Sequence, residues 1–284
     1  MGKRNSVLTK EEKNNVVKLY LDGKNQSEIA RKYGVYPNSI RGLLIRRGIE
    51  LRKNHSPQRK YKIDQNFFDI IDSEEKAYTL GLFYADGSNN EKKGAANINL
   101  KDSDDDILIK LTELIQPEKP LGYYKRRHIN HSDQCMFSIS NRHISNVLAQ
   151  HGCMQNKTHK ITFPKWLDKN LYRHFIRGYF DGDGHIGIYY PKDRNKRKLG
   201  FSIVGTESFC NSLTEIFKEI DVDTNMYCRH PERHNNTRQL HVGKKDCIKK
   251  VMYWMYHDST IYMERKFKKY NEVFNNREES KHGF

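Results

Sequence analysis

Residues 176–184 read IRGYFDGDG, and residues 79–87 carry a second version of the same stretch, TLGLFYADG. Each version predicts an apolar helix that ends in Asp-Gly. Small residues stand four positions apart in each version and therefore share one face of the predicted helix. Because small side chains let two backbones approach closely, we predict that the two helices pack against each other along these faces. The small residues are Gly81, Ala85, Gly178 and Gly182.

The chain after each helix repeats as well. The segment CMFSISNRHI at 135–144 corresponds to RQLHVGKKDC at 238–247, at an offset of 103 residues, and LTEL at 111–114 corresponds to LTEI at 213–216. In both halves the pattern predicts a helix, a hairpin, a helix, a second hairpin and a final helix. We therefore predict an α+β fold built from two similar halves. A duplicated scaffold without activity would show the same repeat.

The two predicted helices end on Asp86 and Asp183. A carboxylate at the carboxyl end of a helix meets the negative end of the helix dipole, at a cost of about 0.3–1 kcal/mol. If the helices pack as predicted, the two carboxylates lie at the same end of the contact and repel each other. A cation between them would relieve both effects, and Mg²⁺ prefers such hard oxygen ligands. The alternative is a purely structural helix contact with two incidental surface carboxylates.

The paired stretches at 79–87 and 176–184 resemble the two copies of the LAGLIDADG motif of homing endonucleases, and the resemblance extends over residues 67–270. It implies a pseudo-twofold, duplicated αββαββα fold whose curved sheets straddle duplex DNA. It also implies that Asp86 and Asp183 are the acidic metal ligands. The activity implied is that of a metal-dependent, site-specific endonuclease that cuts both strands of its DNA target.

The two motif copies differ at their sixth position, which is Tyr84 in the first copy and Asp181 in the second. Because this acid is not shared, we expect Asp181 to tolerate replacement. The family also places a basic residue, commonly lysine, near each scissile phosphate at the end of a late strand. The residues of this chain that match that description are Lys244, Lys245 and Arg142.

Alternation in the predicted strands separates two faces of each sheet. At 97–101, 137–140 and 239–242, apolar side chains point one way and amides, hydroxyls or cations point the other. We interpret the polar face as a DNA-contacting surface, although an ordinary solvated face has the same pattern strand by strand. Basic hairpins at 123–131 and 191–198 would add cationic tips. The candidate DNA contacts of this part are Asn97, Asn99, Lys101, Lys125, Arg126, Ser138, Ser140, Arg229, Arg238 and His241.

The net charge of +16 is concentrated at the amino-terminal end, where residues 1–62 hold 16 Lys and Arg against 5 Asp and Glu. This surplus indicates a polyanionic partner. Helices are predicted at 9–23, 26–34 and 36–48, and their spacing resembles the small helix-turn-helix modules of resolvases and nuclease-associated domains. An ordinary three-helix bundle with a basic face is the alternative. The third helix would present Tyr36, Asn38, Ser39, Arg41 and Arg46 to a major groove.

These patterns divide the chain into consecutive parts. A single chain that holds both motif copies predicts a monomer with internal pseudo-twofold symmetry. The predicted parts are an all-α helix-turn-helix domain at 1–50, a basic linker at 51–66, a first LAGLIDADG repeat at 67–150, a connection at 151–172, a second repeat at 173–270 and a charged tail at 271–284.

Together with the basic charge and the carboxylate pair, the resemblance implies a homing endonuclease that binds Mg²⁺ and a long double-stranded DNA target. It also implies a role in intron homing as part of a mobile genetic element. Two alternatives remain, an inactive DNA-binding regulator and a maturase that binds intron RNA. No long apolar segment or signal peptide is present, so we expect neither membrane insertion nor secretion. The five cysteines form no CxxC pair and predict reduced thiols rather than a zinc site. We expect a cytoplasmic location at the nucleoid of a bacterial or phage-infected cell, with an organelle as the alternative.

Overall fold

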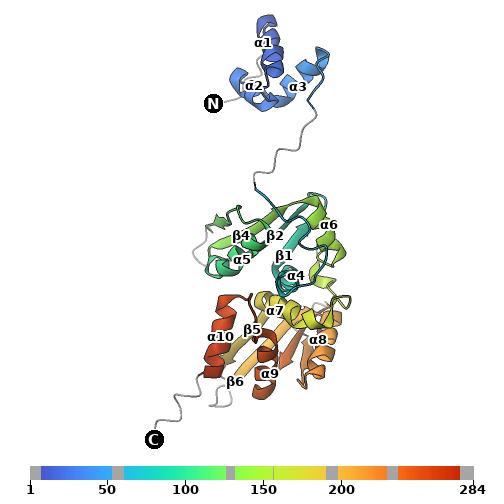
Figure 1. Cartoon of the computed structure of the whole chain (residues 1–284), viewed down its shortest axis with the longest axis vertical. Coiled ribbons are helices and arrows are strands. Elements are labelled where there is room, and N and C mark those ends of the chain that lie inside the picture. Colours follow the sequence, from blue (N-terminus) through green and yellow to red (C-terminus); the bar gives the residue numbers. More distant parts are fainter. Residues whose placement is uncertain are drawn as a thin grey trace. The chain divides into compact units, whose positions relative to one another are not determined.

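A computed structural model of the chain describes residues 8–52, 61–125, 132–155, 157–189, 198–228 and 236–275 (Figure 1). The chain forms two compact units, residues 1–60 and residues 61–284. All five cysteines are free thiols, as predicted. Among the described residues, no helix is both long enough and apolar enough to cross a membrane.

The amino-terminal unit is a bundle of three short helices, α1 (Lys10–Leu21), α2 (Gln26–Tyr33) and α3 (Pro37–Arg46). Capping boxes begin the first two helices, because Thr9 and Asn25 each exchange hydrogen bonds with a glutamate three residues later. Gly34 ends α2 with a φ of +67°, which is why a glycine stands there. The helices share a core made of Val16, Tyr20, Ile29, Ala30, Val35, Ile40, Leu43 and Leu44.

Arg52 belongs to this unit rather than to the linker in which the sequence analysis placed it. Its guanidinium donates to the carbonyl oxygens of Tyr20, Gly23 and Lys24, at 2.5, 2.8 and 2.7 Å. The guanidinium also lies 4.3 Å from the centre of the Tyr20 ring. Arg52 therefore binds carbonyl groups in the last turn of α1 and just after it, where a cation is favourable.

The larger unit contains the same series of elements twice, as the sequence repeat predicted. The helices of the first copy pack their apolar sides against its sheet, and those of the second copy do the same. One further helix, α10 (Glu264–Asn275), follows the second copy. The first copy consists of α4 (Glu74–Asp86), β1 (Gly87–Asn90), β2 (Ala95–Lys101), α5 (Asp105–Ile115), β3 (Gly122–Tyr124), β4 (Gln134–Ser140) and α6 (Arg142–Gln150). The second consists of α7 (Tyr172–Asp183), β5 (Gly184–Tyr189), β6 (Lys198–Thr206), α8 (Glu207–Glu219), β7 (Asn225–Cys228), β8 (Thr237–Val242) and α9 (Lys245–Tyr256).

The two antiparallel sheets have equivalent strand orders, β1-β2-β4-β3 and β5-β6-β8-β7. Their registers also agree. Ile98 pairs with Phe137 in the first sheet, and Ile203 pairs with Leu240 in the second. Leu240 lies 103 positions after Phe137, so the offset read from the sequence is the structural offset between strands β4 and β8.

The two copies meet through α4 and α7, which lie side by side between the sheets (Figure 1). A Cβ atom on Gly81 would lie 2.0 Å from the carbonyl oxygen of Phe175, and one on Gly178 would lie 2.0 Å from that of Tyr78. No side chain fits at these distances, so the helices touch backbone to backbone. The predicted role of the small residues is therefore confirmed, and we call this helix contact the seam.

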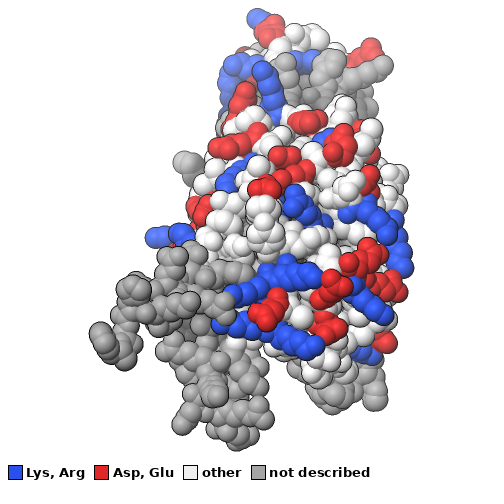
Figure 2. Space-filling model, turned by 60° about the horizontal axis from the view of Figure 1, so that its bottom comes forward, with Lys and Arg blue, Asp and Glu red and all other residues white. Residues whose placement is uncertain are grey.

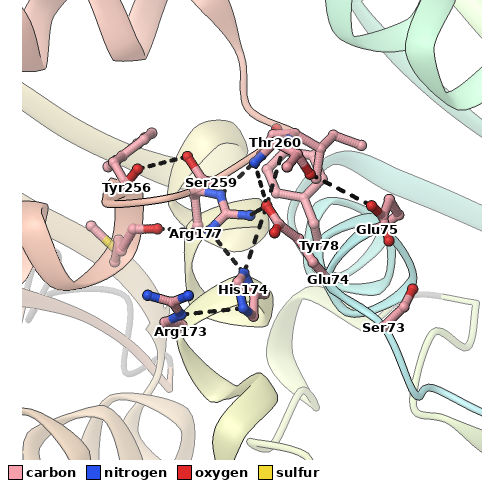
Figure 3. Close-up of polar contacts among 12 residues, drawn as sticks. Ser73, Glu74, Glu75, Tyr78, Arg173, His174, Arg177, Tyr256, Ser259 and Thr260 are labelled. Carbon is pink, nitrogen blue, oxygen red and sulfur yellow. Dashed lines mark hydrogen bonds and ion pairs between the residues drawn. The ribbon is translucent and has the colours of Figure 1, made fainter.

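The amino-terminal ends of the seam helices are joined by a buried ionic cluster (Figure 3). Arg177 on α7 is fully buried and donates to the Glu74 carboxylate of α4 at 2.6 Å. The same carboxylate accepts the backbone N–H of Thr260 at 2.7 Å. Burial and the neighbouring Arg177 lower the pKa of His174 to about 4, so that His174 accepts a hydrogen bond from Arg177 as a neutral ring. The cluster ties both copies to the chain segment that leads into α10.

Candidate functional site

Asp86 and Asp183 end the two seam helices at the end opposite the ionic cluster. A Cβ atom on Gly182 would lie 2.6 Å from Oδ2 of Asp86, so this carboxylate rests on the glycine beside Asp183. The glycines that follow, Gly87 and Gly184, begin the first strand of each sheet. The helix contact thereby brings the two predicted carboxylates together.

The electrostatics of this pair are unfavourable in the isolated protein. Loss of water around Asp86, and then repulsion from Asp183, raise the pKa of Asp86 to about 6. Asp183 keeps an exposed edge, yet desolvation raises its pKa as well. Within the described part of the chain, no hydrogen-bond donor reaches either carboxylate. Two carboxylates that repel each other and lack donors form a site that favours a bound cation.

Two lysines that the sequence analysis did not single out lie beside the pair. Lys157 follows α6, and its ammonium group donates to the carbonyl oxygen of Ala85 at 3.1 Å. Lys266 lies in α10, and its ammonium group donates to the carbonyl oxygens of Phe180, at 3.3 Å, and Gly184. The positive charges of both lysines act against the rise in the pKa of Asp86.

Lys157 and Lys266 are themselves held in partly dry surroundings. Only 5% of the Lys266 surface is exposed, and burial lowers the pKa of its side chain to about 8. Desolvation likewise lowers the pKa of Lys157. These ammonium groups supply part of the positive charge that the sequence analysis assigned to a metal ion alone.

The structure does not bring the predicted basic residues to the aspartates. Lys244 pairs with Asp223 at 2.8 Å on the surface. Gly184 follows Asp183 and pairs with Ile203, which in turn pairs with Leu240, so Gly184 and Leu240 lie at the same level of the sheet. Lys244 comes after Leu240 in the chain and lies about 13 Å beyond this level, at about 3.3 Å per residue. Lys245 is exposed and begins α9, beyond the same end of the sheet.

Arg142 has the equivalent position in the first copy. It is exposed and begins α6. Gly87 pairs with Ile98, and Ile98 pairs with Phe137, so Arg142 lies five residues beyond the level of Gly87 in the sheet. The geometry therefore gives no support to a late strand end as the basic site. The lysines reach the aspartates from segments that follow the last helix of each copy.

Asp181, the unshared motif acid, is fully buried. It accepts hydrogen bonds from the hydroxyl groups of Tyr78 at 2.6 Å and Tyr256 at 2.5 Å, and from the backbone N–H of Met263 at 2.8 Å. Its counterpart Tyr84 donates its hydroxyl to the carbonyl oxygen of His151. The expectation that Asp181 tolerates replacement disagrees with these contacts, because its removal would leave three buried donors without an acceptor.

The polar faces of the sheets follow the predicted alternation. In β2, Ile98 and Leu100 are buried while Asn99 and Lys101 are exposed. Several of the candidate contacts already have partners, since Ser138 accepts from Lys119 and Arg238 pairs with Glu207 at 2.6 Å. Asn97, Ser138 and His241 are half-buried, Ser140 and Lys125 are exposed, and Arg126 and Arg229 lie outside the described residues.

The predicted DNA-contacting side of the amino-terminal unit is accessible. Tyr36 precedes α3, and 48% of its surface is exposed. Pro37 begins the helix, where its fixed φ suits the first turn. The side chains proposed to enter a groove, Asn38, Ser39, Arg41 and Arg46, are all exposed along α3.

No protein-family model and no curated protein sequence matches this chain. Among solved structures, the LAGLIDADG homing endonuclease I-GzeII in complex with its DNA target is similar, with a TM-score of 0.51 and 12% identity over 73% of this chain and 92% of that one. The chain has the LAGLIDADG homing endonuclease fold. LAGLIDADG meganuclease I-AabMI bound to uncleaved DNA has a TM-score of 0.48 and 12% identity over 72% of this chain and 92% of its own. I-LtrWI bound to target DNA has a TM-score of 0.47 and 13% identity over 77% and 93%.

Within this LAGLIDADG fold, the repeat in the sequence does not reveal the two lysines. Lys157 lies 71 positions after Asp86, whereas Lys266 lies 83 positions after Asp183. The two therefore do not align when the motif copies are superposed on the sequence. A search for cations in the connections after each repeat would have included both.

Proposed function

We propose that this protein is a homing endonuclease, which hydrolyses both strands of a specific DNA target with Mg²⁺ held between Asp86 and Asp183. The observation that carries the proposal is the meeting of these two carboxylates at one end of the seam, beside two cationic side chains and without a hydrogen-bond donor from any described residue. The similar structure of I-GzeII with its DNA target supports DNA as the substrate.

The donors of this site fit Mg²⁺ better than a softer metal. Among the described residues no group of three or more His, Cys, Asp or Glu side chains could hold a metal ion. Mg²⁺ is commonly bound through one or two carboxylates, with water and substrate phosphate as the other ligands. When bound, the ion would neutralise phosphate charge and activate water for attack on phosphorus.

The lysines would act on the phosphate groups of the substrate. Each ammonium group lies at the end of one seam helix, beside the carboxylate of that helix. A cation fixed in a partly dry site stabilises negative charge that develops on a phosphate more strongly than a solvated one does. The pseudo-twofold relation between the copies would assign Lys157 to one strand and Lys266 to the other.

A monomer would suffice for this reaction, because one chain holds both carboxylates and both sheets. The polar sheet faces would read base edges and phosphates along a long target. Asn99, Lys101 and Ser140 are exposed on the first of these faces and His241 is half-buried on the second. We assign the described members of the predicted contact set to this surface.

The helix-turn-helix interpretation of residues 1–50 is part of the proposal. The surface in Figure 2 shows Lys and Arg interspersed with Asp and Glu, rather than a face of one sign. The charge surplus at 1–62 would therefore supply much of the salt-dependent attraction to DNA. Deleting residues 1–60 should weaken binding, reduce its salt dependence and shorten the protected DNA segment; an unchanged footprint would contradict this role.

The decisive experiment is incubation of the purified chain with Mg²⁺ and a library of duplex targets. A double-strand break at a defined sequence is expected with the wild type and is expected to be lost in Asp86→Asn and Asp183→Asn. Sequence-specific binding without any break would instead favour the inactive regulator. Binding of intron RNA without DNA cleavage would favour the maturase. A break at a site that an intron interrupts in related genes would connect the activity to intron homing and a mobile element. In cells, we expect the protein to be located with the nucleoid.

A further inference from the structure

The segment that carries Lys266 is anchored on the opposite repeat. Arg265 donates two hydrogen bonds to the Asp104 carboxylate of the first repeat, at 2.8 and 2.9 Å. The backbone N–H of Glu264 donates to Asp106, at 3.0 Å, next to the same turn. Lys266 then turns back to the second repeat, where its ammonium group bonds to the end of α7.

Among the described residues, the Asp104 carboxylate bonds to Arg265 alone. Only 3% of its surface is exposed, and it stands at the N-cap position of α5 without making a side-chain cap bond. Both of its oxygens are used by Arg265. A two-bond pair between arginine and a carboxylate fixes direction as well as distance. The pair therefore fixes the backbone immediately before Lys266.

The segment that carries Lys157 follows the first repeat and is bonded to the second repeat. The carbonyl oxygen of Ile161 accepts a hydrogen bond of 2.5 Å from the hydroxyl group of Thr206, in the second repeat. Thr206 is the N-cap of α8, and only 1% of its surface is exposed. The helix α8 is the second-repeat counterpart of α5. Asp104 and Thr206 therefore hold equivalent places in the two repeats.

We propose that Asp104 and Thr206 are positioning residues that act across the seam. Each stands at the start of the middle helix of one repeat and fixes the segment whose lysine serves the motif aspartate of the other repeat. The role of the lysines in cleavage rests on the proposed function. A substitution of Asp104 or of Thr206 should therefore displace one lysine and leave the other in place. It should slow the cleavage of one DNA strand more than that of the other.

The first test measures the lysines without DNA or metal. The full-length chain is treated with an N-hydroxysuccinimide ester, and the acylation rate of each lysine is measured by mass spectrometry. Asp104→Asn should raise the acylation rate of Lys266 by about tenfold, because removing the charge of the buried Asp104 carboxylate weakens its two bonds to Arg265 and populates local opening. The rate for Lys157 should not change. Asp102→Asn, in the same turn but on an exposed aspartate, is the matched control.

The reciprocal variant completes this test. Thr206→Val should raise the acylation rate of Lys157 and leave that of Lys266 unchanged, whereas Thr206→Ser keeps the hydroxyl group and should match the wild type. Urea unfolding of each variant under the same conditions separates local from global effects. Equal changes at both lysines, or none, would overturn the proposal.

The second test measures strand-resolved cleavage of an end-labelled duplex. Asp104→Asn should slow the cutting of one strand by about tenfold or more relative to the other, since small misplacement of a catalytic group has large effects on rate. Thr206→Val should slow the opposite strand. If the wild type cuts and Asp104→Asn slows both strands equally, crossed positioning fails. If the wild type cuts neither strand, the proposed function fails. The acylation rates then still test whether Asp104 positions Lys266 and Thr206 positions Lys157.

Discussion

The carbonyl oxygen of Tyr78 lies so close to Gly178 that a Cβ atom on this glycine would sit 2.0 Å from it. The seam therefore has no room for a methyl group at its centre. Gly178→Ala should lower the free energy of unfolding by about 3 kcal/mol, at the upper end for an overpacked core. Urea unfolding of the full chain measures this. Gly243→Ala is the matched control, because its new Cβ would have no neighbour closer than 3.7 Å. Equal stability of the two variants would show that the seam can separate.

Asp181 and Asp183 should differ sharply when each is replaced by alanine. Asp181→Ala leaves two tyrosine hydroxyl groups and the N–H of Met263 without an acceptor, and should cost about 3 kcal/mol or more. Asp183 accepts no hydrogen bond from the described residues, so Asp183→Ala should leave the free energy of unfolding nearly unchanged or slightly higher. Thermal unfolding without metal compares them. A stable Asp181→Ala variant would restore the expectation that this acid is dispensable.

Asp86 should reduce the stability of the metal-free protein as the pH rises. Its pKa is about 6 when folded against an ordinary value of 3.8, so the folded state binds more protons between these values. The free energy of unfolding should therefore fall as the pH rises from about 4 to about 6. The shift corresponds to about 3 kcal/mol at most, and partial exposure reduces this to about 1–2 kcal/mol.

Asp86→Asn removes this penalty and should be the more stable protein at pH 7 in the presence of a chelator. The measurement is urea unfolding over a pH series, with Asp102→Asn at an exposed position as the control. Mg²⁺ should raise the melting temperature of the wild type but not of Asp86→Asn, and should bind the wild type more weakly as the pH falls below about 6. Parallel pH profiles for wild type and Asp86→Asn would contradict the assigned pKa.

The sequence predicted the parts of this structure that depend on short-range pattern. Small residues four positions apart define the seam, and alternation in β2 defines the two faces of the sheet. Those features follow from the periods of helix and strand, which are properties of neighbouring residues. The resemblance to the LAGLIDADG motif then identified the carboxylate pair from the same two stretches.

The sequence did not predict contacts that depend on how the segments after the last helix of each repeat pack against the seam. Lys157 and Lys266 reach the aspartates from segments of different length after the last helix of each repeat. The surroundings of Asp181 are set by Tyr256 and Met263, more than 70 residues away along the chain. Neither kind of contact leaves a period or a motif, so both needed the tertiary structure.

The adjacent residues Glu74 and Glu75 provide a matched test of the buried ionic cluster (Figure 3). Glu74 is the partner of the fully buried Arg177 and accepts the N–H of Thr260. Among the described residues, the Glu75 carboxylate makes a single contact, at 3.5 Å with the Thr260 hydroxyl group. Glu74→Gln should cost about 2 kcal/mol or more, because it leaves a buried guanidinium without its charge partner. Glu75→Gln should cost less than about 0.5 kcal/mol. Urea unfolding decides between these outcomes. Arg177 also donates to the carbonyl oxygens of Ile261 and Met255, at 3.0 and 2.6 Å, and similar costs would mean that these two bonds alone compensate its burial.

Arg52 should stabilise the amino-terminal unit although it stands beyond the last helix. Its guanidinium binds one carbonyl group in the last turn of α1 and two just after it, and stacks on Tyr20. Arg52→Ala should raise the hydrogen-exchange rates of the α1–α3 amides by about tenfold or more, equivalent to about 1–2 kcal/mol for an exposed but multiply bonded cation. The amides of the larger unit should not change. Arg47→Ala, which removes an exposed arginine at the end of α3, is the control. Both variants remove one positive charge, so a loss of DNA binding that is caused by unfolding of the unit should appear only in Arg52→Ala. Equal hydrogen-exchange rates in the two variants would show that the three helices hold together without the Arg52 contacts.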